Sequence, residues 1–362
     1  MSEFDVIVIG GGPAGCYAAL AAATKGCTVA LFEEDGAIGW PRHDPGWLME
    51  SDFATSLINA VGKAVPWSKV EEYRVCNSES GELIEKSKRG GYIVRRDLLE
   101  KEIALLAVKA GAELYLKTRV TNLIRSEGRA VGVETGSTAM PKAEAKIIIC
   151  ADGIRSAGHG LAKKEGMCES TNLLKPGISY LLANAEVSAG IIEHFLSSDP
   201  LLNYKTFFTH RDGLSVLGVP TSSAFHDLKQ RRDNVVSQKI RHAFPIEITG
   251  YSRTSSGKYA KYFERMIKDN ILFVGDASGG AGNIHGMVQG QFAGTVAASA
   301  IKERDISERR LFEYQDLVRN SLGKAPFYYF SAREDFGSFD NWFHEVETST
   351  RGITAMEFSL MR

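Results

Sequence analysis

Three glycines near the start of the chain have the spacing of a phosphate-binding turn. Gly10, Gly12 and Gly15 form the pattern G-x-G-x-x-G, with Pro13 and Ala14 between the last two. In this pattern the first glycine permits a tight turn, the second lets the backbone approach a pyrophosphate, and the third lets a helix pack closely on a strand. Amide groups at the start of the following helix attract negative phosphates. The spacing therefore predicts that this turn binds a dinucleotide.

An acidic pair follows the glycines at a distance suited to a dinucleotide. Glu33 lies 23 residues after Gly10, and Glu34 is next to it. A carboxylate at this position can accept hydrogen bonds from ribose hydroxyls. The elements that would position these groups occur in the expected order, an apolar strand, an alanine-rich helix and a second strand, over residues 4–9, 16–25 and 28–32. This order favours a dinucleotide site over a glycine-rich turn in some other α/β unit.

Two places in the sequence carry side chains that could transfer a proton. His43 and Asp44 stand in a loop rich in glycine, proline and tryptophan, over residues 35–47. His285 stands just before a helix expected from Gly286 to about residue 303. Each of these groups has a second interpretation, because a loop or helix-start side chain also forms hydrogen bonds within its own segment.

The composition excludes several classes of protein. The 362 residues carry a net charge of -1, with 44% hydrophobic and 24% charged residues, which gives no basis for nucleic-acid binding. No apolar run is long enough to span a membrane, and the chain enters its first strand without a signal peptide. The five cysteines form no C-x-x-C pair, so we expect neither an iron–sulfur cluster nor a redox disulfide, and no metal site: Cys16, Cys27, Cys76, Cys150 and Cys168. Unpaired thiols fit a cytoplasmic location.

The remaining pattern predicts an α/β protein with an inserted sheet. A helix over residues 97–110 and buried strands over 146–150 and 270–274 complete a Rossmann-like unit. Alternating segments between residues 171 and 262 favour an antiparallel sheet. We therefore expect a discontinuous nucleotide-binding domain, a substrate domain that also takes strands from 70–95, and a C-terminal helical cap, at residues 1–165 with 265–305, 166–264 and 306–362.

The C-terminal segment carries an aromatic cluster with two interpretations. Its members lie between residues 327 and 343: Phe327, Tyr328, Tyr329, Phe330, Phe336, Phe339, Trp342 and Phe343. They could close an apolar cavity, or they could face a membrane or a partner protein.

Four separated motifs resemble those of FAD-dependent oxidoreductases related to p-hydroxybenzoate hydroxylase. They are the glycine turn, Arg96 before a helix, and two short turns, Ala151-Asp152-Gly153 and Gly275-Asp276-Ala277. Within this superfamily the chain most resembles the geranylgeranyl reductase family, including archaeal digeranylgeranylglycerophospholipid reductases. Three stretches carry that resemblance: Ile38-Gly39-Trp40-Pro41, residues 96–113 and Gly275-Asp276-Ala277-Ser278-Gly279.

The resemblance implies FAD as the cofactor and a role for each matching residue. The ADP half of FAD would be held by the glycine turn and the acidic pair: Gly10, Gly12, Pro13, Ala14, Gly15, Glu33 and Glu34. The backbone of Val120 would lie near the adenine. Further contacts with the cofactor would come from Arg96, Asp152, Gly153, Asp276 and the helix start at Gly286, Met287 and Val288. At that helix start, amide groups and the helix dipole could stabilise negative charge on the reduced flavin.

Three kinds of chemistry are compatible with such a flavin site. The first, which the resemblance favours, is reduction of a carbon–carbon double bond in an apolar, prenyl or lipid-like substrate, with a proton from His285, His43, Asp44 or water. The second is an electron-transfer module that passes electrons to a quinone or a protein partner. The third is an aromatic monooxygenase, against which the chain has Gly279 and Asn283 where the related hydroxylases usually have His and Pro.

The expected partners are an electron donor and an apolar substrate. There is no second G-x-G-x-x-G motif for NAD(P)H, so the electron donor could be a ferredoxin, a partner flavoprotein or transiently bound NAD(P)H. The substrate is expected to be an apolar small molecule. Peripheral contact with a membrane is compatible with both an apolar substrate and the aromatic C-terminal segment.

Overall fold

The computed structural model describes residues 2–40, 46–153, 156, 160–167, 174–196, 205–209, 213–220, 225–248, 252–255, 264–279, 282–322 and 338–356. Its first sheet has the strand order β18-β19-β11-β1-β2-β8, with the hairpin β9–β10 attached to β11. The strands are β1 (Ser2–Ile9), β2 (Val29–Phe32), β8 (Glu113–Tyr115), β9 (Val120–Ser126), β10 (Arg129–Thr135), β11 (Lys142–Cys150), β18 (Ile267–Lys268) and β19 (Ile271–Phe273). β1 lies in the middle and pairs in parallel with both β2 and β11, as the expected Rossmann-like unit requires.

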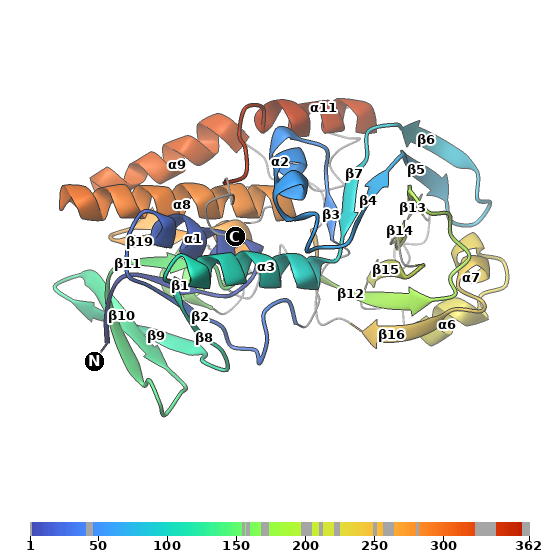
Figure 1. Ribbon diagram of the computed structural model, residues 1–362. Helices are drawn as coiled ribbons and strands as arrows, with labels where there is room; N and C mark the ends of the chain where they lie inside the picture. The colour runs from blue at the N-terminus through green and yellow to red at the C-terminus, as the bar shows by residue number, and fades with distance from the viewer. Residues whose placement is uncertain are drawn as a thin grey trace.

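The two faces of this sheet are covered by different layers. Val6 and Val8 of β1 face a core shared with four helices, whereas Ile7 and Ile9 face a smaller core that contains residues of β10. The helices are α1 (Pro13–Thr24), α3 (Arg96–Lys109), α8 (Asn283–Glu303) and α9 (Glu308–Leu322). Figure 1 shows these helices on one side of the strands and the hairpin β9–β10 on the other. This α/β arrangement confirms the predicted fold class.

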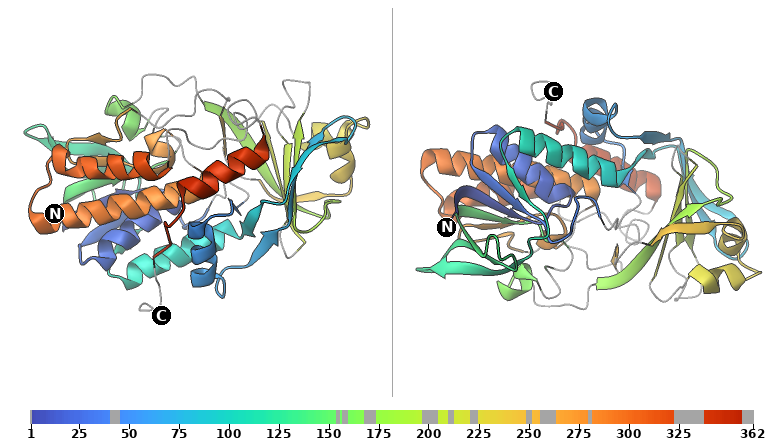
Figure 2. Two further views of the ribbon diagram at one scale, coloured as in Figure 1. Left: turned by 90° about the horizontal axis from the view of Figure 1, so that it is seen from above. Right: turned by 60° about the horizontal axis from the view of Figure 1, so that its bottom comes forward.

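A second sheet combines strands from distant parts of the chain. Its order is β16-β12-β15-β14-β13-β5-β6, and β17 also pairs with β12. The strands are β5 (Glu72–Asn77), β6 (Leu83–Ser87), β12 (Leu174–Ala183), β13 (Ile191–Leu196), β14 (Lys205–Thr209), β15 (Ser215–Pro220), β16 (Phe244–Ile248) and β17 (Ser252–Ser255). β13 pairs in parallel with β5, and the other pairs are antiparallel. Both views of Figure 2 show this sheet beside the first one, at the other end of the molecule.

A small sheet and short helices fill the space around the two large sheets. The small sheet has the order β3-β7-β4, from β3 (Trp47–Leu48), β4 (Trp67–Val70) and β7 (Gly91–Val94). The short helices are α2 (Asp52–Val61), α5 (Leu161–Lys164), α6 (Phe225–Gln230), α7 (Val235–Lys239) and α11 (Phe339–Ser349). None of the helices in the described ranges combines the length and the apolar character needed to cross a bilayer.

Two helix assignments from the sequence need correction. The segment 171–262 contains α6 and α7, not strands alone, and these helices cover one face of the second sheet through Leu228, Val236 and Ile240. Helix α8 begins at Asn283 rather than at Gly286, because Gly282 adopts an extended N-cap conformation. His285 therefore lies in the first turn of α8 and not on the preceding loop.

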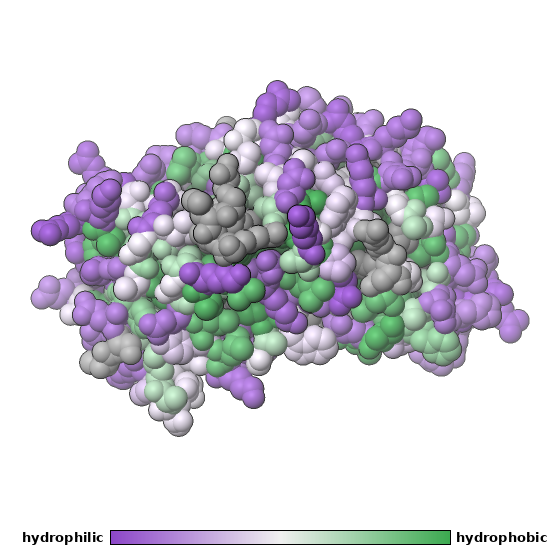
Figure 3. All heavy atoms as spheres, viewed as in Figure 1, coloured by the Kyte–Doolittle hydropathy of each residue, from purple (hydrophilic) through white to green (hydrophobic). Residues whose placement is uncertain are grey.

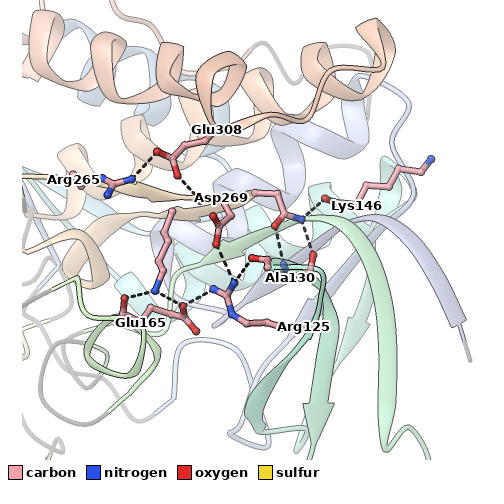
Figure 4. A network of polar contacts seen from close by, with 10 residues as sticks. Arg125, Ala130, Lys146, Glu165, Arg265, Asp269 and Glu308 are labelled. Carbon is pink, nitrogen blue, oxygen red and sulfur yellow. Dashed lines mark hydrogen bonds and ion pairs between the residues drawn. The ribbon is translucent and has the colours of Figure 1, made fainter.

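A polar network ties the hairpin β9–β10 to the first sheet (Figure 4). The side chain of Asn270 pairs with both backbone groups of Ala130, at 3.0 and 2.6 Å, and also donates to the carbonyl oxygen of Lys146, at 2.7 Å. Arg125 forms ion pairs with Glu165 and Asp269. Because Asn270 is buried and satisfies three backbone groups, it fixes the start of β10 beside the middle of β11.

Candidate functional site

The turn after β1 is shaped by two close backbone contacts. Gly10 has a φ of +100°, and a Cβ there would lie 2.4 Å from the carbonyl oxygen of Ala151. A Cβ on Gly15 would lie 1.9 Å from the carbonyl oxygen of Gly10. Both positions therefore need glycine for the fold itself.

Gly12, the N-cap of α1, has a different environment. A Cβ on Gly12 would meet no described atom within 4 Å, so the turn opens to free space at this point. Pro13 occupies the first helical position, and the amide groups of Ala14 and Gly15 follow it at the helix start. Free space beside a helix N-terminus is the arrangement that a pyrophosphate requires, so this turn fits the diphosphate of FAD.

Glu33 is held beside the glycine turn by two backbone amides. Its Oε2 accepts a hydrogen bond from the amide of Gly11 at 2.6 Å, and its Oε1 accepts one from the amide of Asp35 at 2.8 Å. Burial raises the pKa of Glu33, and these two hydrogen bonds oppose the increase. A carboxylate oriented in this way keeps lone pairs for the ribose hydroxyls of FAD. Glu34 pairs instead with Arg119, at 3.4 Å.

Helix α8 reaches the glycine turn because it packs directly on the backbone of α1. A Cβ on Gly290 would lie 2.1 Å from the carbonyl oxygen of Ala14, and one on Gly294 would lie 2.3 Å from that of Ala18. At its start, a Cβ on Gly286 would lie 3.6 Å from the Cβ of Ala14 and 3.8 Å from the Cα of Gly275. The glycine turn and the α8 start are thereby brought together, as the sequence predicts for one cofactor site.

Gln289 fixes the turn that carries Asp276. Its Oε1 accepts hydrogen bonds from the amide of Gly275 at 2.7 Å and from the hydroxyl of Ser278 at 3.0 Å, within the 3₁₀ turn Gly275–Ser278. Gln289 is completely buried. Sequence reasoning missed this residue, although a polar side chain within a helix rich in alanine and glycine was a signal for it.

Arg96 and Asp152 come from two other elements near the glycine turn, helix α3 and the end of β11. Arg96, at the start of α3, forms a largely buried ion pair with Glu100. Helix α3 packs in the same core as α1, the helix that follows the glycine turn. Burial, with the carboxylates of Glu100 and Glu33, raises the pKa of Cys16 in α1.

Asp152 follows β11, and burial raises its pKa. Within the described residues its Oδ1 is buried without a hydrogen-bond partner, which leaves an acceptor at the site. Its neighbour Gly153 has a φ of +68° and faces open space.

Val120 lies at the start of β9, close to the end of β2. The amide of Thr118 donates to the carbonyl oxygen of Glu33 at 2.8 Å, so the chain leading to Val120 passes the acidic pair. This is the side on which an adenine would lie if Glu33 held the ribose. Met287 and Val288 follow Gly286 in α8 and are buried.

The structure describes one of the three predicted proton donors, His285. His285 is 1% exposed, and burial lowers its pKa to about 3, so its imidazole is neutral near pH 7. A neutral imidazole is a weak acid, which bears against direct proton transfer from this residue. His43 and Asp44 lie outside the described residues.

An aromatic cluster that sequence reasoning missed lies next to the start of α8. The ring of Trp47 stacks on Tyr73 at 5.7 Å between centroids, and Phe343 of α11 meets both rings edge-on at 5.9 and 5.4 Å. Asn283 donates to the carbonyl oxygen of Trp47 at 3.2 Å. Phe343 is the member of the predicted C-terminal aromatic cluster whose buried packing is described, and residues 327–336 lie outside the described residues.

Several known proteins are similar in sequence to this chain. A family model described as FAD dependent oxidoreductase matches residues 5–160. Digeranylgeranylglycerophospholipid reductase 2 of Methanopyrus kandleri is 30% identical, over 94% of this chain and 88% of its own. Digeranylgeranylglycerophospholipid reductase 1 of Methanosphaera stadtmanae is 32% identical, over 87% of this chain and 80% of its own.

Solved structures share the fold at lower identity. A geranylgeranyl bacteriochlorophyll reductase-like protein from Thermoplasma acidophilum superposes with a TM-score of 0.73 and 22% identity, covering 100% of this chain and 95% of that chain. A variant of the flavin-dependent brominase Bmp2 gives a TM-score of 0.68 at 16% identity, covering 96% of this chain and 95% of that chain. These two likenesses show the fold, which proteins with different reactions share.

Proposed function

The chain belongs to the digeranylgeranylglycerophospholipid reductase family of FAD-dependent oxidoreductases, and on this premise we propose that it reduces carbon–carbon double bonds in prenyl chains of a lipid. The observation that carries the proposal is the extent of the likeness. Identity of 30% over 94% of the chain includes the second sheet as well as the FAD motifs. The FAD motifs alone would not separate a reductase from other flavoproteins, because the same fold serves many reactions.

In this proposal FAD, when bound, supplies the hydride that the double bond accepts. The chain's own residues hold and orient the cofactor. The backbone at Gly12 and the first turn of α1 bind the diphosphate, and Glu33 accepts from the ribose. Gln289 keeps the Gly275–Ser278 turn in place beside them. The positive end of the α8 dipole lies at its first turn, Asn283 to His285, whereas the amide of Gly286 already donates to the carbonyl oxygen of Gly282.

The second hydrogen arrives as a proton at the other carbon of the double bond. His43, Asp44 and His285 remain the proposed sources, together with water. The lowered pKa of His285 favours a role in which its neutral imidazole orients a water or the substrate by a hydrogen bond. His43 and Asp44 are then the candidates that could release a proton themselves.

The partners in this proposal are an apolar lipid substrate and a separate source of electrons. A ferredoxin, NAD(P)H or a partner flavoprotein could reduce the flavin, since the sequence has no second dinucleotide motif. A cytoplasmic protein that touches the membrane surface would have access to both.

Reoxidation of the reduced flavin tests the proposal. The purified holoprotein would be photoreduced without oxygen, and flavin absorbance would be followed after adding digeranylgeranylglycerophospholipid, a quinone or air. We expect fast reoxidation by the unsaturated lipid and slow reoxidation by air, with product analysis showing saturated bonds. Reoxidation by quinone alone would contradict the proposal and favour an electron-transfer module. Fast reaction with air, accelerated by an aromatic ligand, would favour a monooxygenase.

A further inference from the structure

Three apolar side chains on one strand are exposed far more than the core residues around them. Phe244, Ile246 and Ile248 of β16 are 63, 59 and 58% exposed. Figure 3 shows hydrophobic residues gathered at the lower right of centre, in the area that β16 occupies in Figure 1. We call these three residues the β16 stripe. Exposed apolar residues at alternate positions of a single strand are unusual on a monomer surface and indicate a contact site.

The stripe lies at the outer edge of the second sheet. Among the strands that the structure describes, β16 pairs with β12 and ends the sheet on that side. Ile248 is opposite Tyr180, which packs in the core beneath α6 and α7. The pairing of β16 with β12 has a register shift between Leu181 and Leu182, so alternation alone does not place Phe244 on the same face as Ile248. Phe244 is instead placed beside α6 by its contact with Lys229, and the stripe therefore borders the side of the sheet that the two helices cover.

The strand edge itself is a poor template for another strand. Pro245 is the second of the five residues of β16 and has no amide hydrogen to donate. Proline on an edge strand is one of the features that prevent sheets from joining edge to edge. A second copy of the chain that extended the sheet would meet this interruption, so the exposed side chains fit a partner that needs no backbone hydrogen bonds.

Lys229 lies beside the stripe, and further basic residues are on the segment that leads to it. The Nζ of Lys229 lies 5.5 Å from the ring centroids of both Phe225 and Phe244, and it donates to the carbonyl oxygen of Ala243. Further exposed cations stand on the connection from α6 to β16, namely Arg231, Arg232 and Arg241. Acidic neighbours on the same segment are fewer, namely Asp227, Asp233 and Glu247. Lys239 is already paired with Glu193, at 2.8 Å.

We propose that the β16 stripe and its basic surroundings bind the chain to the surface of an anionic lipid bilayer. The apolar side chains enter the boundary between headgroups and acyl chains, and the cations contact the anionic headgroups. This choice of partner rests on the proposed function, because a lipid substrate resides in the bilayer. The stripe is too short for stable anchoring, so the contact is reversible and weakens with salt.

Vesicle binding tests the proposal directly. The holoprotein would be sedimented with vesicles of phosphatidylcholine alone, and with vesicles that also contain phosphatidylglycerol. We expect binding to the anionic vesicles, weaker binding at high salt, and little binding to neutral vesicles. The double variant Ile246→Ser/Ile248→Ser should bind roughly tenfold less tightly or weaker, because each residue loses a buried apolar side chain. Arg231→Gln/Arg232→Gln should bind less and show a smaller salt dependence.

A matched control separates the stripe from general surface effects. Leu105 and Val108 of α3 are 46 and 43% exposed, and Leu105→Ser/Val108→Ser removes similar apolar groups elsewhere. This control should bind vesicles as the unchanged protein does. Equal loss in both double variants, or unchanged vesicle binding in the stripe variant, would overturn the proposal. A stripe variant that dissociates an oligomer in sedimentation velocity, without a change in vesicle binding, would assign the surface to a second copy.

Turnover of detergent-dispersed substrate distinguishes this proposal from the proposed function. The stripe variants should reduce dispersed substrate at the normal rate and substrate in anionic vesicles more slowly. Vesicle binding without any turnover would contradict the reductase function and leave the surface in place. Turnover without any vesicle binding would contradict the surface and leave the reductase in place.

Discussion

Gly12 and Gly15 stand three residues apart in one turn, and their surroundings separate cofactor binding from folding. A Cβ on Gly15 collides with the carbonyl oxygen of Gly10, whereas a Cβ on Gly12 points into open space. The same type of residue is therefore required by the fold at Gly15, and at Gly12 we propose that it leaves room for the ligand.

We expect Gly12→Val to fold but to lose FAD, because the added side chain occupies the space intended for the diphosphate. Gly15→Ala should destabilise the protein by about 2 kcal/mol or more, since backbone must move to accept the Cβ. Flavin absorbance after gel filtration and urea unfolding of the apoproteins would measure the two effects. A Gly12→Val protein that retains a full complement of FAD would contradict the dinucleotide assignment.

Gln289 gives a second prediction for a single residue. Gln289→Met keeps the volume but removes the acceptor for Gly275 and Ser278, which leaves a buried amide unsatisfied. The free energy of unfolding should fall by about 1–3 kcal/mol, and FAD should bind more weakly. Gln291→Met is the matched control two positions later, because the Gln291 amide reaches an exposed carbonyl of Thr354 at 3.2 Å. Equal effects of the two changes on FAD affinity would remove Gln289 from the site.

The contact between α1 and α8 determines the geometry of the site at the scale of elements. Both helices are rich in small residues, and Gly290 and Gly294 let their backbones meet. This contact brings residues 283–288 to the turn at residues 10–15. The position of each helix in the site is thus set by residues that do not touch the ligand.

A methyl group at this contact should act on both the fold and the site. We expect Gly290→Ala to lower the free energy of unfolding by about 1–3 kcal/mol, because its Cβ would lie 2.1 Å from the carbonyl oxygen of Ala14. FAD affinity should fall with it as α8 moves away from α1. Gly136→Ala is the control, since the nearest atom to its Cβ would lie at 3.9 Å. Denaturant unfolding and fluorescence titration with FAD check both effects, and an unchanged affinity in Gly290→Ala would contradict the coupling.

The elements that the sequence predicted well have strong local signals. The unit β1–α1–β2 combines a continuous apolar strand, a glycine motif and a helix that lies almost wholly in the core. The sequence places the start of α8 at Gly286, three residues after the observed start at Asn283, which follows the N-cap Gly282. Helices α6 and α7 are short, and their apolar residues do not have a period that distinguishes them from strands.

Sequence reasoning named Phe343 in the C-terminal aromatic cluster but missed its meeting with Trp47 and Tyr73, as well as the role of Gln289, because these depend on distant contacts. Trp47, Tyr73 and Phe343 come from three separate parts of the chain, and Gln289 acts on a turn formed before its own helix. Local secondary-structure propensity does not predict which distant residues come into contact. FAD as the cofactor could be predicted because its binding motif has a fixed spacing in the sequence, whereas the aromatic cluster has no motif.

At the scale of the whole molecule, buried histidines should set the acid limit of stability. Burial lowers the pKa of His194 to about 4 and that of His285 to about 3, from 6.5. Below pH 6.5 the unfolded chain takes up protons at these residues and the folded chain does not. The buried histidines therefore make their full contribution to the free energy of unfolding above pH 6.5. This free energy falls as the pH decreases toward 4, by about 3 kcal/mol for His194.

The raised pKa values of Glu33 and Asp152 act in the opposite direction, because burial disfavours their charged forms. As the pH decreases through the raised pKa values, the folded chain takes up protons at these carboxyl groups before the unfolded chain does, which adds stability. Urea unfolding between pH 7 and 4 would measure the slope. His194→Gln should flatten this slope relative to the unchanged protein, and an equal slope in both proteins would show that His194 does not control it.

The pairing of early and late segments has a consequence for synthesis of the chain. Helix α1 leaves the ribosome near the beginning, but its partner α8 is made after both large sheets. Until then the small-residue face of α1 has no cover, and the turn at Gly275 that completes the cofactor site does not yet exist. We therefore expect the complete FAD site to form only after α8 has been made, so FAD has no complete site to bind while the first strands fold.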